Sequence, residues 1–142
     1  MANCKQFDDG IFIGPQPTEQ DLTEVKQQGV QTVIDMRMPS ETATPNAELV
    51  KNSGLDYVNI PVDKAALSVQ KIDEFDAALK QNNGPVLLHC ATGTRAAMLL
   101  ALSRARQHGW TAERTFQEAE AMGYNLQSSP GFAAFVRQTT GK

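Results

Sequence analysis

Two kinds of hydrophobic pattern alternate along this chain. Short, largely apolar runs, which are typical of buried strands, occupy residues 11–14, 30–36, 56–62 and 86–89. Between them, apolar residues recur at helical spacing, as in the series Val69, Ile72, Phe75 and Leu79. Strands that alternate with helices in this way predict an α/β sandwich. The run at 86–88 contains no polar residue, so we expect that strand to lie in the middle of the sheet.

Capping and turn residues indicate where the helices begin and end. Thr18, with Asp21 at the capping-box position, begins a helix that Gly29 ends. Ser68 and Thr111 begin two further helices. The predicted helices cover residues 18–28, 48–52, 68–81, 96–108 and 111–122, and a last one starts at Pro130. The helix at 96–108 is apolar nearly all round in its first turns, which indicates burial inside the fold.

Length, composition and net charge limit the class of protein and the partners that we expect. Its 142 residues fit a single domain, residues 1–142, with 41% hydrophobic and 20% charged residues. The net charge of −3 disfavours a nucleic-acid partner. The sequence contains neither a run of membrane-spanning length nor an apolar leader at its start, so we expect a cytoplasmic protein that does not bind membranes.

The two cysteines, Cys4 and Cys90, are too few for a disulfide scaffold. They indicate a reactive thiol in a reducing compartment instead. Cys4 lies in a polar terminus, where we expect an ordinary surface residue rather than a second working thiol.

One segment gathers most of the candidate chemistry. The buried run at 86–88 continues into His89-Cys90, then the loop Ala91-Thr92-Gly93-Thr94, then Arg95 and an apolar helix. A cysteine attacks as the thiolate, and the N–H groups and positive dipole end of a helix favour a negative charge there. The N–H groups of residues 91–95 can also hold an anionic substrate. The combination predicts a cysteine nucleophile in an anion-binding loop.

The other residues of this segment have supporting roles in that interpretation. Gly93 allows a backbone conformation that other residues avoid, and Thr92 and Thr94 add hydroxyl donors. Arg95 presents a planar fork that matches a tetrahedral oxyanion. His89 either orients the loop through its backbone or relays a proton, and we favour the structural role.

The chain resembles a bacterial family in three motifs. They are this loop, Gly14-Pro15-Gln16-Pro17 and Thr32-Val33-Ile34-Asp35-Met36-Arg37. The family is the phosphatase-like domain of beta-lactamase-hydrolase-like proteins, also described as a sulfur-transferase domain. The resemblance covers about residues 7–136. It implies the fold of dual-specificity and tyrosine phosphatases, with a central, mostly parallel sheet flanked by helices.

The chain departs from the phosphatase signature at two points. Phosphatases of this fold place five residues between cysteine and arginine and a Ser or Thr after the arginine. Here four residues separate Cys90 from Arg95, and Ala96 follows. The shorter spacing is similar to the loop of rhodaneses, which carry sulfur as a cysteine persulfide. A tighter loop suits one terminal sulfur better than a phosphoryl group with three oxygens.

Several other residues are candidates for the site. Asp63 follows the third predicted strand, where this fold places a general acid, although a solvated loop residue is the simpler interpretation. Arg37 and Glu41 match the family's strand-end pattern, either as a structural ion pair, which we favour, or at the border of the pocket. Tyr124 and Asn125 either line its rim or form an ordinary turn, and we favour the turn.

These features predict an enzyme with Cys90 as nucleophile. The leading hypothesis is a sulfurtransferase that moves sulfane sulfur from a small anionic donor to a thiol acceptor through a Cys90 persulfide. The alternative is a phosphomonoester phosphatase that forms a Cys90 thiophosphate on a phosphorylated substrate, with Asp63 as the acid. A third hypothesis is a silent anion-binding module, which would not need the thiol. We expect no metal or cofactor, since no metal-ligand cluster is visible, and the resemblance suggests a sulfide-oxidising partner enzyme.

Overall fold

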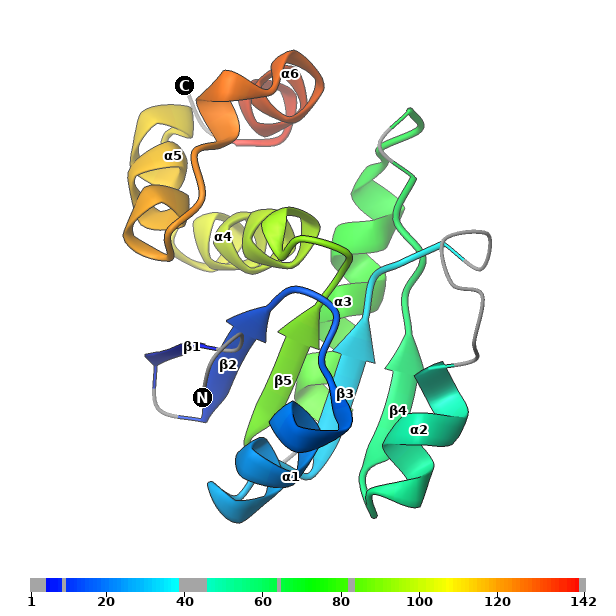
Figure 1. Ribbon diagram of the computed structural model, residues 1–142. Helices are drawn as coiled ribbons and strands as arrows, with labels where there is room; N and C mark the ends of the chain where they lie inside the picture. Colours follow the sequence, from blue (N-terminus) through cyan, green and yellow to red (C-terminus); the bar gives the residue numbers. More distant parts are fainter. Residues whose placement is uncertain (1–4, 9, 39–45, 64, 82–83, 141–142) are drawn as a thin grey trace.

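The computed structural model describes residues 5–8, 10–38, 46–63, 65–81 and 84–140. Its centre is a five-stranded sheet in the order β1-β2-β5-β3-β4 (Figure 1). The strands are β1 (Lys5–Asp8), β2 (Ile11–Gly14), β3 (Thr32–Asp35), β4 (Asp56–Asn59) and β5 (Val86–His89). The strands β2, β5, β3 and β4 are parallel, and β1 pairs antiparallel with β2. The predicted α/β class is therefore confirmed, and β5 is the central strand as its apolar sequence indicated.

Helices cover both faces of the sheet, which explains why its strands are so apolar. The helices α1 (Glu19–Gln27) and α2 (Asn46–Asn52) pack on one face. On the other face lie α3 (Val69–Gln81) and α4 (Thr94–His108), and α5 (Ala112–Ala121) and α6 (Pro130–Thr139) pack against α4. Figure 1 shows α5 and α6 beside α4, away from α1 and α2.

Successive side chains along each strand point to opposite faces of the sheet, so they pack into two separate cores. Leu87 on β5 packs with Val33 in the core under α1 and α2. The next residue, Leu88, packs with Ile34 in the larger core under α3 to α6. Both leucines have no exposed surface, and truncating either one to alanine would cost about 2–5 kcal/mol of folding free energy. These two cores hold the carboxyl ends of the strands in register.

Most predicted element boundaries agree with the structure. Thr18 and Asp21 form the expected capping box of α1, and Thr111 caps α5 through the backbone N–H of Arg114. Gly109, in a left-handed conformation, ends α4. As expected, α4 is buried along most of its length. None of the helices in the described ranges is long and apolar enough to cross a membrane.

Five elements differ from the predicted secondary structure. The expected strands at 30–36 and 56–62 are shorter, because only Thr32–Asp35 and Asp56–Asn59 form ladder pairs. The strand β1 was not expected, since an edge strand with one apolar residue carries little signal. The short 3-10 helix η2 (Leu126–Ser128) was not expected either. The helix α4 begins at Thr94, two residues before the predicted start, because the loop after Cys90 runs directly into it.

Candidate active site

The candidate loop lies at the carboxyl edge of the sheet, directly after the central strand. His89 ends β5 and is in register with Gly14 on β2 and Asp35 on β3. In open α/β sheets, ligands bind outside the carboxyl ends of the strands. The topology therefore places Cys90 at the edge where this fold class builds its sites.

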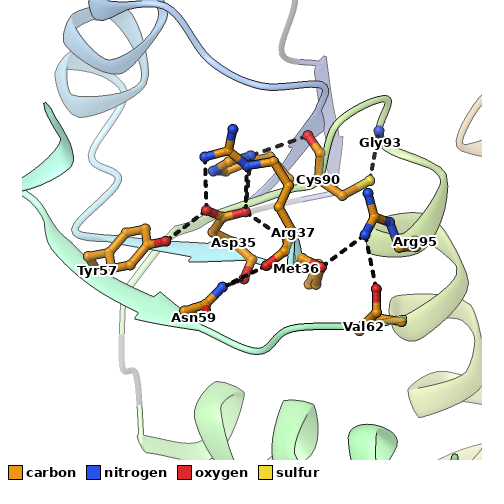
Figure 2. Close-up of polar contacts among 10 residues, drawn as sticks. Asp35, Met36, Arg37, Tyr57, Asn59, Val62, Cys90, Gly93 and Arg95 are labelled. Atoms are coloured by element: carbon orange, nitrogen blue, oxygen red, sulfur yellow. Dashed lines mark hydrogen bonds and ion pairs between the residues drawn. The ribbon is translucent and has the colours of Figure 1, made fainter. Parts of the chain in front are cut away.

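The Cys90 thiol is enclosed by its own loop. Cys90 has no exposed surface, and its Sγ accepts a hydrogen bond of 3.0 Å from the Gly93 backbone N–H (Figure 2). Gly93 has a φ of +100°, a region that favours glycine, and it is the N-cap residue of α4. The sulfur thus lies against the N-terminus of a 15-residue helix, where a negative charge is favoured.

Arg95 is held by two main-chain carbonyls below the loop. Its Nη1 donates to the oxygen of Val62 at 2.9 Å and to that of Met36 at 3.4 Å (Figure 2). These carbonyls belong to the segments that follow β4 and β3. The side chain is only 3% exposed, so the guanidinium connects three loops at the sheet edge and fixes their relative position.

The remaining loop residues face outward to different degrees. Ala91 and Thr92 are exposed, and the hydroxyls of Thr92 and Thr94 lie 3.1 Å apart in a hydrogen bond with each other. The carbonyl of Ala91 accepts a bond of 3.4 Å from the backbone N–H of Gln16. The expected loop residues 91–95 are therefore assembled around Cys90.

A buried polar cluster lies next to the loop. The Asp35 carboxylate accepts from Arg37 Nε at 3.0 Å and Nη2 at 3.1 Å, and from Tyr57 Oη at 2.7 Å (Figure 2). Asn59 Nδ2 donates to the Asp35 carbonyl at 2.7 Å. Arg37 therefore forms a structural ion pair with Asp35. Its expected pairing with Glu41 stays a prediction, because Glu41 lies outside the described residues.

His89 connects this cluster to Cys90. Its Nδ1 lies 3.4 Å from the Cys90 carbonyl and 3.8 Å from Asp35 Oδ1. A carbonyl can only accept, so the hydrogen bond to Cys90 requires the proton on Nδ1. The structural role that the sequence favoured for His89 agrees with this geometry.

Burial and charge decide the protonation states in the cluster. Burial lowers the pKa of His89 to about 4, so the ring is neutral at neutral pH. Burial opposes ionisation of Asp35, but hydrogen bonds from Arg37 and Tyr57 help to hold the pKa of its carboxyl below the usual value. Burial and the hydrogen bond to Asp35 raise the pKa of the Tyr57 hydroxyl. The cluster therefore holds one carboxylate and one guanidinium, balanced in charge.

Asp63 is exposed and follows Val62, whose carbonyl binds Arg95. Its Oδ1 accepts a hydrogen bond of 2.9 Å from the Ala65 backbone N–H, and its carbonyl accepts one from Ala66. The carboxylate therefore stabilises a local turn. This position is close in sequence to the site, and its role as a general acid stays a prediction.

A cavity of about 380 Å³ adjoins the loop of residues 91–95. Thr92, Thr94 and Arg95 line one side, and the segment between α5 and α6 lines the other with Tyr124 and Asn125 among its residues. The expectation of an ordinary turn at Tyr124 and Asn125 is wrong, because this segment packs over the loop. A β-carbon at Gly93 would overlap Tyr124 Oη and lie 2.6 Å from Cζ.

Sequence reasoning missed Asp35, Tyr57 and Asn59 as parts of the site. Asp35 stood at the end of an apolar strand, which was a signal that could have identified it. Tyr57 and Asn59 reach Asp35 only through the pairing of β4 with β3. The described residues include no group of three or more His, Cys, Asp or Glu side chains that could hold a metal ion.

The chain is similar in sequence to a family of known proteins. Residues 4–107 match the family described as the phosphatase-like domain of beta-lactamase hydrolase-like protein. The chain belongs to this family. It is 29% identical over 121 residues to the beta-lactamase hydrolase-like protein of Xylella fastidiosa, covering 82% of this chain and 28% of the relative. The chain thus spans about a quarter of the length of that curated relative.

Solved structures of family-like proteins confirm the fold. A candidate phosphatase from Neisseria meningitidis is 27% identical, with 98% of this chain and 99% of that chain covered and a TM-score of 0.80. A candidate phosphatase from Shewanella putrefaciens is also 27% identical, with coverage of 99% and 92% and a TM-score of 0.80. The TpbA protein of P. aeruginosa, solved with phosphotyrosine, is 18% identical with a TM-score of 0.74 and coverage of 95% and 83%, so it shares the fold alone. The chain is therefore a phosphatase-like domain in family and in fold.

Proposed function

We propose that this domain is a sulfurtransferase that carries one sulfur atom as a persulfide on Cys90. The observation that supports this reaction best is the short loop: four residues separate Cys90 from Arg95, and the loop encloses Sγ completely. Adding one sulfur atom at Sγ requires less room than adding a phosphoryl group with three oxygens. The Gly93 N–H, which now donates to Sγ, is available to a sulfur anion at the same place.

The proposed reaction has two steps that balance in atoms and charge. The Cys90 thiolate attacks the outer sulfur of a small anionic donor such as thiosulfate. The sulfur–sulfur bond of the donor breaks, and sulfite leaves with the electron pair. A thiolate acceptor then attacks the outer sulfur of the persulfide, and the Cys90 thiolate leaves. Neither step requires a metal, an oxidant or proton transfer to an alkoxide.

The neighbouring residues have defined parts in this proposal. His89 holds the Cys90 carbonyl, and Arg95 fixes the loop against the segments after β3 and β4. The N–H groups of residues 91–95 stabilise the charge of donor and persulfide. Arg37 neutralises the charge of Asp35 and so stabilises the buried polar cluster next to the loop.

Phosphomonoester hydrolysis is the second candidate, and the comparisons support it better than they support sulfur transfer. The solved proteins with 27% identity are described as candidate phosphatases. In this reaction Cys90 would form a thiophosphate, Arg95 would bind phosphoryl oxygens and Asp63 would protonate the leaving group. In the structure Asp63 Oδ1 accepts from the Ala65 N–H, and Arg95 Nη1 donates to two main-chain carbonyls. The third hypothesis, a silent anion-binding module, gives no role to the enclosed thiol.

One pair of assays on the same purified protein distinguishes these reactions. We expect thiocyanate formation from thiosulfate and cyanide, and a mass increase of one sulfur atom on Cys90 after thiosulfate treatment. Cys90→Ser should retain the fold and lose both signals, because the side chains are nearly isosteric. Efficient aryl phosphate hydrolysis that is lost in Asp63→Asn, with no persulfide on Cys90, would establish the phosphatase instead.

The cellular setting is part of the same proposal. A Cys90 thiolate works in a reducing compartment, so we propose the cytoplasm. A sulfide-oxidising enzyme that supplies or consumes the persulfide is the proposed partner. The greater length of the curated relatives is consistent with a second activity beside this domain in those chains.

A further inference from the structure

The cavity beside the catalytic loop extends the site beyond Cys90 itself. Its volume of about 380 Å³ is in the range of small-molecule sites. Thr92 and Thr94 form its catalytic side. Tyr124, Asn125, Ser128 and Ser129 form the opposite side, from the connection between α5 and α6. The cavity therefore lies between two parts of the chain that are about thirty residues apart in sequence.

The chemistry of the lining is uniform. Apart from Gly123 and Phe132, every lining residue carries a hydroxyl, an amide or, in Arg95, a guanidinium. No lining residue is a carboxylate, so an anionic ligand meets no like charge. With Arg95 as the one cation in the lining, the cavity suits a singly charged organic molecule with hydrogen-bonding groups better than a strongly charged phosphate ester.

Tyr124 lines this cavity and also lies against the loop residue that binds Cys90. Its hydroxyl end is so close to Gly93 that a β-carbon there would overlap it, and Gly93 donates directly to Cys90 Sγ. A molecule in the cavity thus contacts the loop that holds the sulfur and lies beside the side chain that covers Gly93.

We propose that this cavity binds the body of the acceptor, a small organic thiol with a carboxylate and an amide, while its sulfur approaches Cys90 past Tyr124. The assignment rests on the proposed sulfur transfer and adds to it the class of acceptor. The acceptor thiolate attacks the outer persulfide sulfur, the new sulfur–sulfur bond forms on the acceptor, and the Cys90 thiolate leaves with its electron pair. Tyr124 and Ser129 then determine specificity without taking part in the bond changes.

The test separates an acceptor that needs the cavity from one that does not. N-acetylcysteine carries the expected groups, and cyanide is too small to depend on them. Ser129→Phe fills the cavity, and because the Ser129 side chain makes no capping hydrogen bond in α6, its loss leaves the helix start intact. We expect the ratio of the KM for N-acetylcysteine to the KM for cyanide to rise at least tenfold. Gln127→Phe is the matched control, since Gln127 is exposed and does not line the cavity.

A second measurement uses the wild-type protein and so does not depend on the folding of a variant. N-acetylalanine, which lacks the thiol, should compete with N-acetylcysteine and leave the cyanide reaction unaffected. An unchanged KM ratio in folded Ser129→Phe, or N-acetylalanine that fails to compete, overturns the cavity assignment while a Cys90 persulfide still supports sulfur transfer. A wild-type protein that never forms the persulfide overturns the proposed function and this assignment together.

Discussion

Replacing Gly93 with alanine tests the arrangement of loop, thiol and Tyr124 in one step. The new β-carbon meets two separate obstacles. The φ of +100° is strained for a residue with a side chain, and the Tyr124 hydroxyl occupies the space that the methyl group needs. Any backbone shift that relieves the overlap also moves the N–H that donates to Cys90 Sγ. We therefore expect both stability and activity to fall.

Gly29 separates the two contributions to the loss of stability. It has the same φ of +100°, but a β-carbon there makes only an ordinary contact of 3.7 Å with Pro85. Left-handed strain costs about 1–2 kcal/mol, partly offset by a gain of about 0.4–1 kcal/mol from the unfolded chain, so Gly29→Ala should lose about 1 kcal/mol. Overlap in packed surroundings adds about 1–3 kcal/mol, so Gly93→Ala should lose about 2–4 kcal/mol in total.

Urea unfolding measures these differences in the free energy of unfolding. In thermal unfolding, each kcal/mol corresponds to about 3 °C in the melting temperature. In a Tyr124→Ala background, the cost of Gly93→Ala should fall to that of Gly29→Ala, which a double-mutant cycle detects. Thiocyanate formation by Gly93→Ala should fall at least tenfold, whereas Gly29→Ala should keep the wild-type rate. Equal stability losses at the two glycines, together with an active Gly93→Ala, would refute the reasoning.

Three further predictions follow from the polar contacts of the site. Arg95→Lys should lose at least about tenfold in activity, or about 1.4 kcal/mol, because lysine cannot reproduce the guanidinium fork; wild-type rates would leave Arg95 only a charge at the helix start. Burial lowers the pKa of His89 from its ordinary value of 6.5 to about 4, so its stabilising contribution is complete above pH 6.5 and is lost as the pH falls through 4. Because of this group, the free energy of unfolding should be about 2 kcal/mol larger at pH 7 than at pH 5. His89→Asn should remove that difference. Tyr57→Phe should cost about 1–2 kcal/mol in urea unfolding, because the Asp35 carboxylate loses a donor at 2.7 Å; an unchanged midpoint would mean that water replaces the hydroxyl.

Local sequence signals determined the elements and the reactive loop. Apolar runs and capping residues predicted the helices and four of the five strands, since both depend on neighbours a few residues apart. The assembly of Cys90, Gly93 and Arg95 was equally visible, because the loop and its helix are continuous in sequence. The edge strand β1 was missed, since its pairing with β2 is a tertiary event with little hydrophobic pattern.

Tertiary structure alone decided the contacts that join distant segments. Asp35, Tyr57 and His89 meet only because three strands lie in register at one sheet edge, and residue spacing does not encode that register. In the same way, Arg95 binds the carbonyls of residues 36 and 62, and Tyr124 covers Gly93, across gaps that no local pattern spans. The sequence by itself determined which residues carry the chemistry, because thiol, guanidinium and helix N-terminus are properties of one short segment. How enclosed the thiol is, what supports the loop and what lies across from it depend on packing between elements, which only the folded chain brings together.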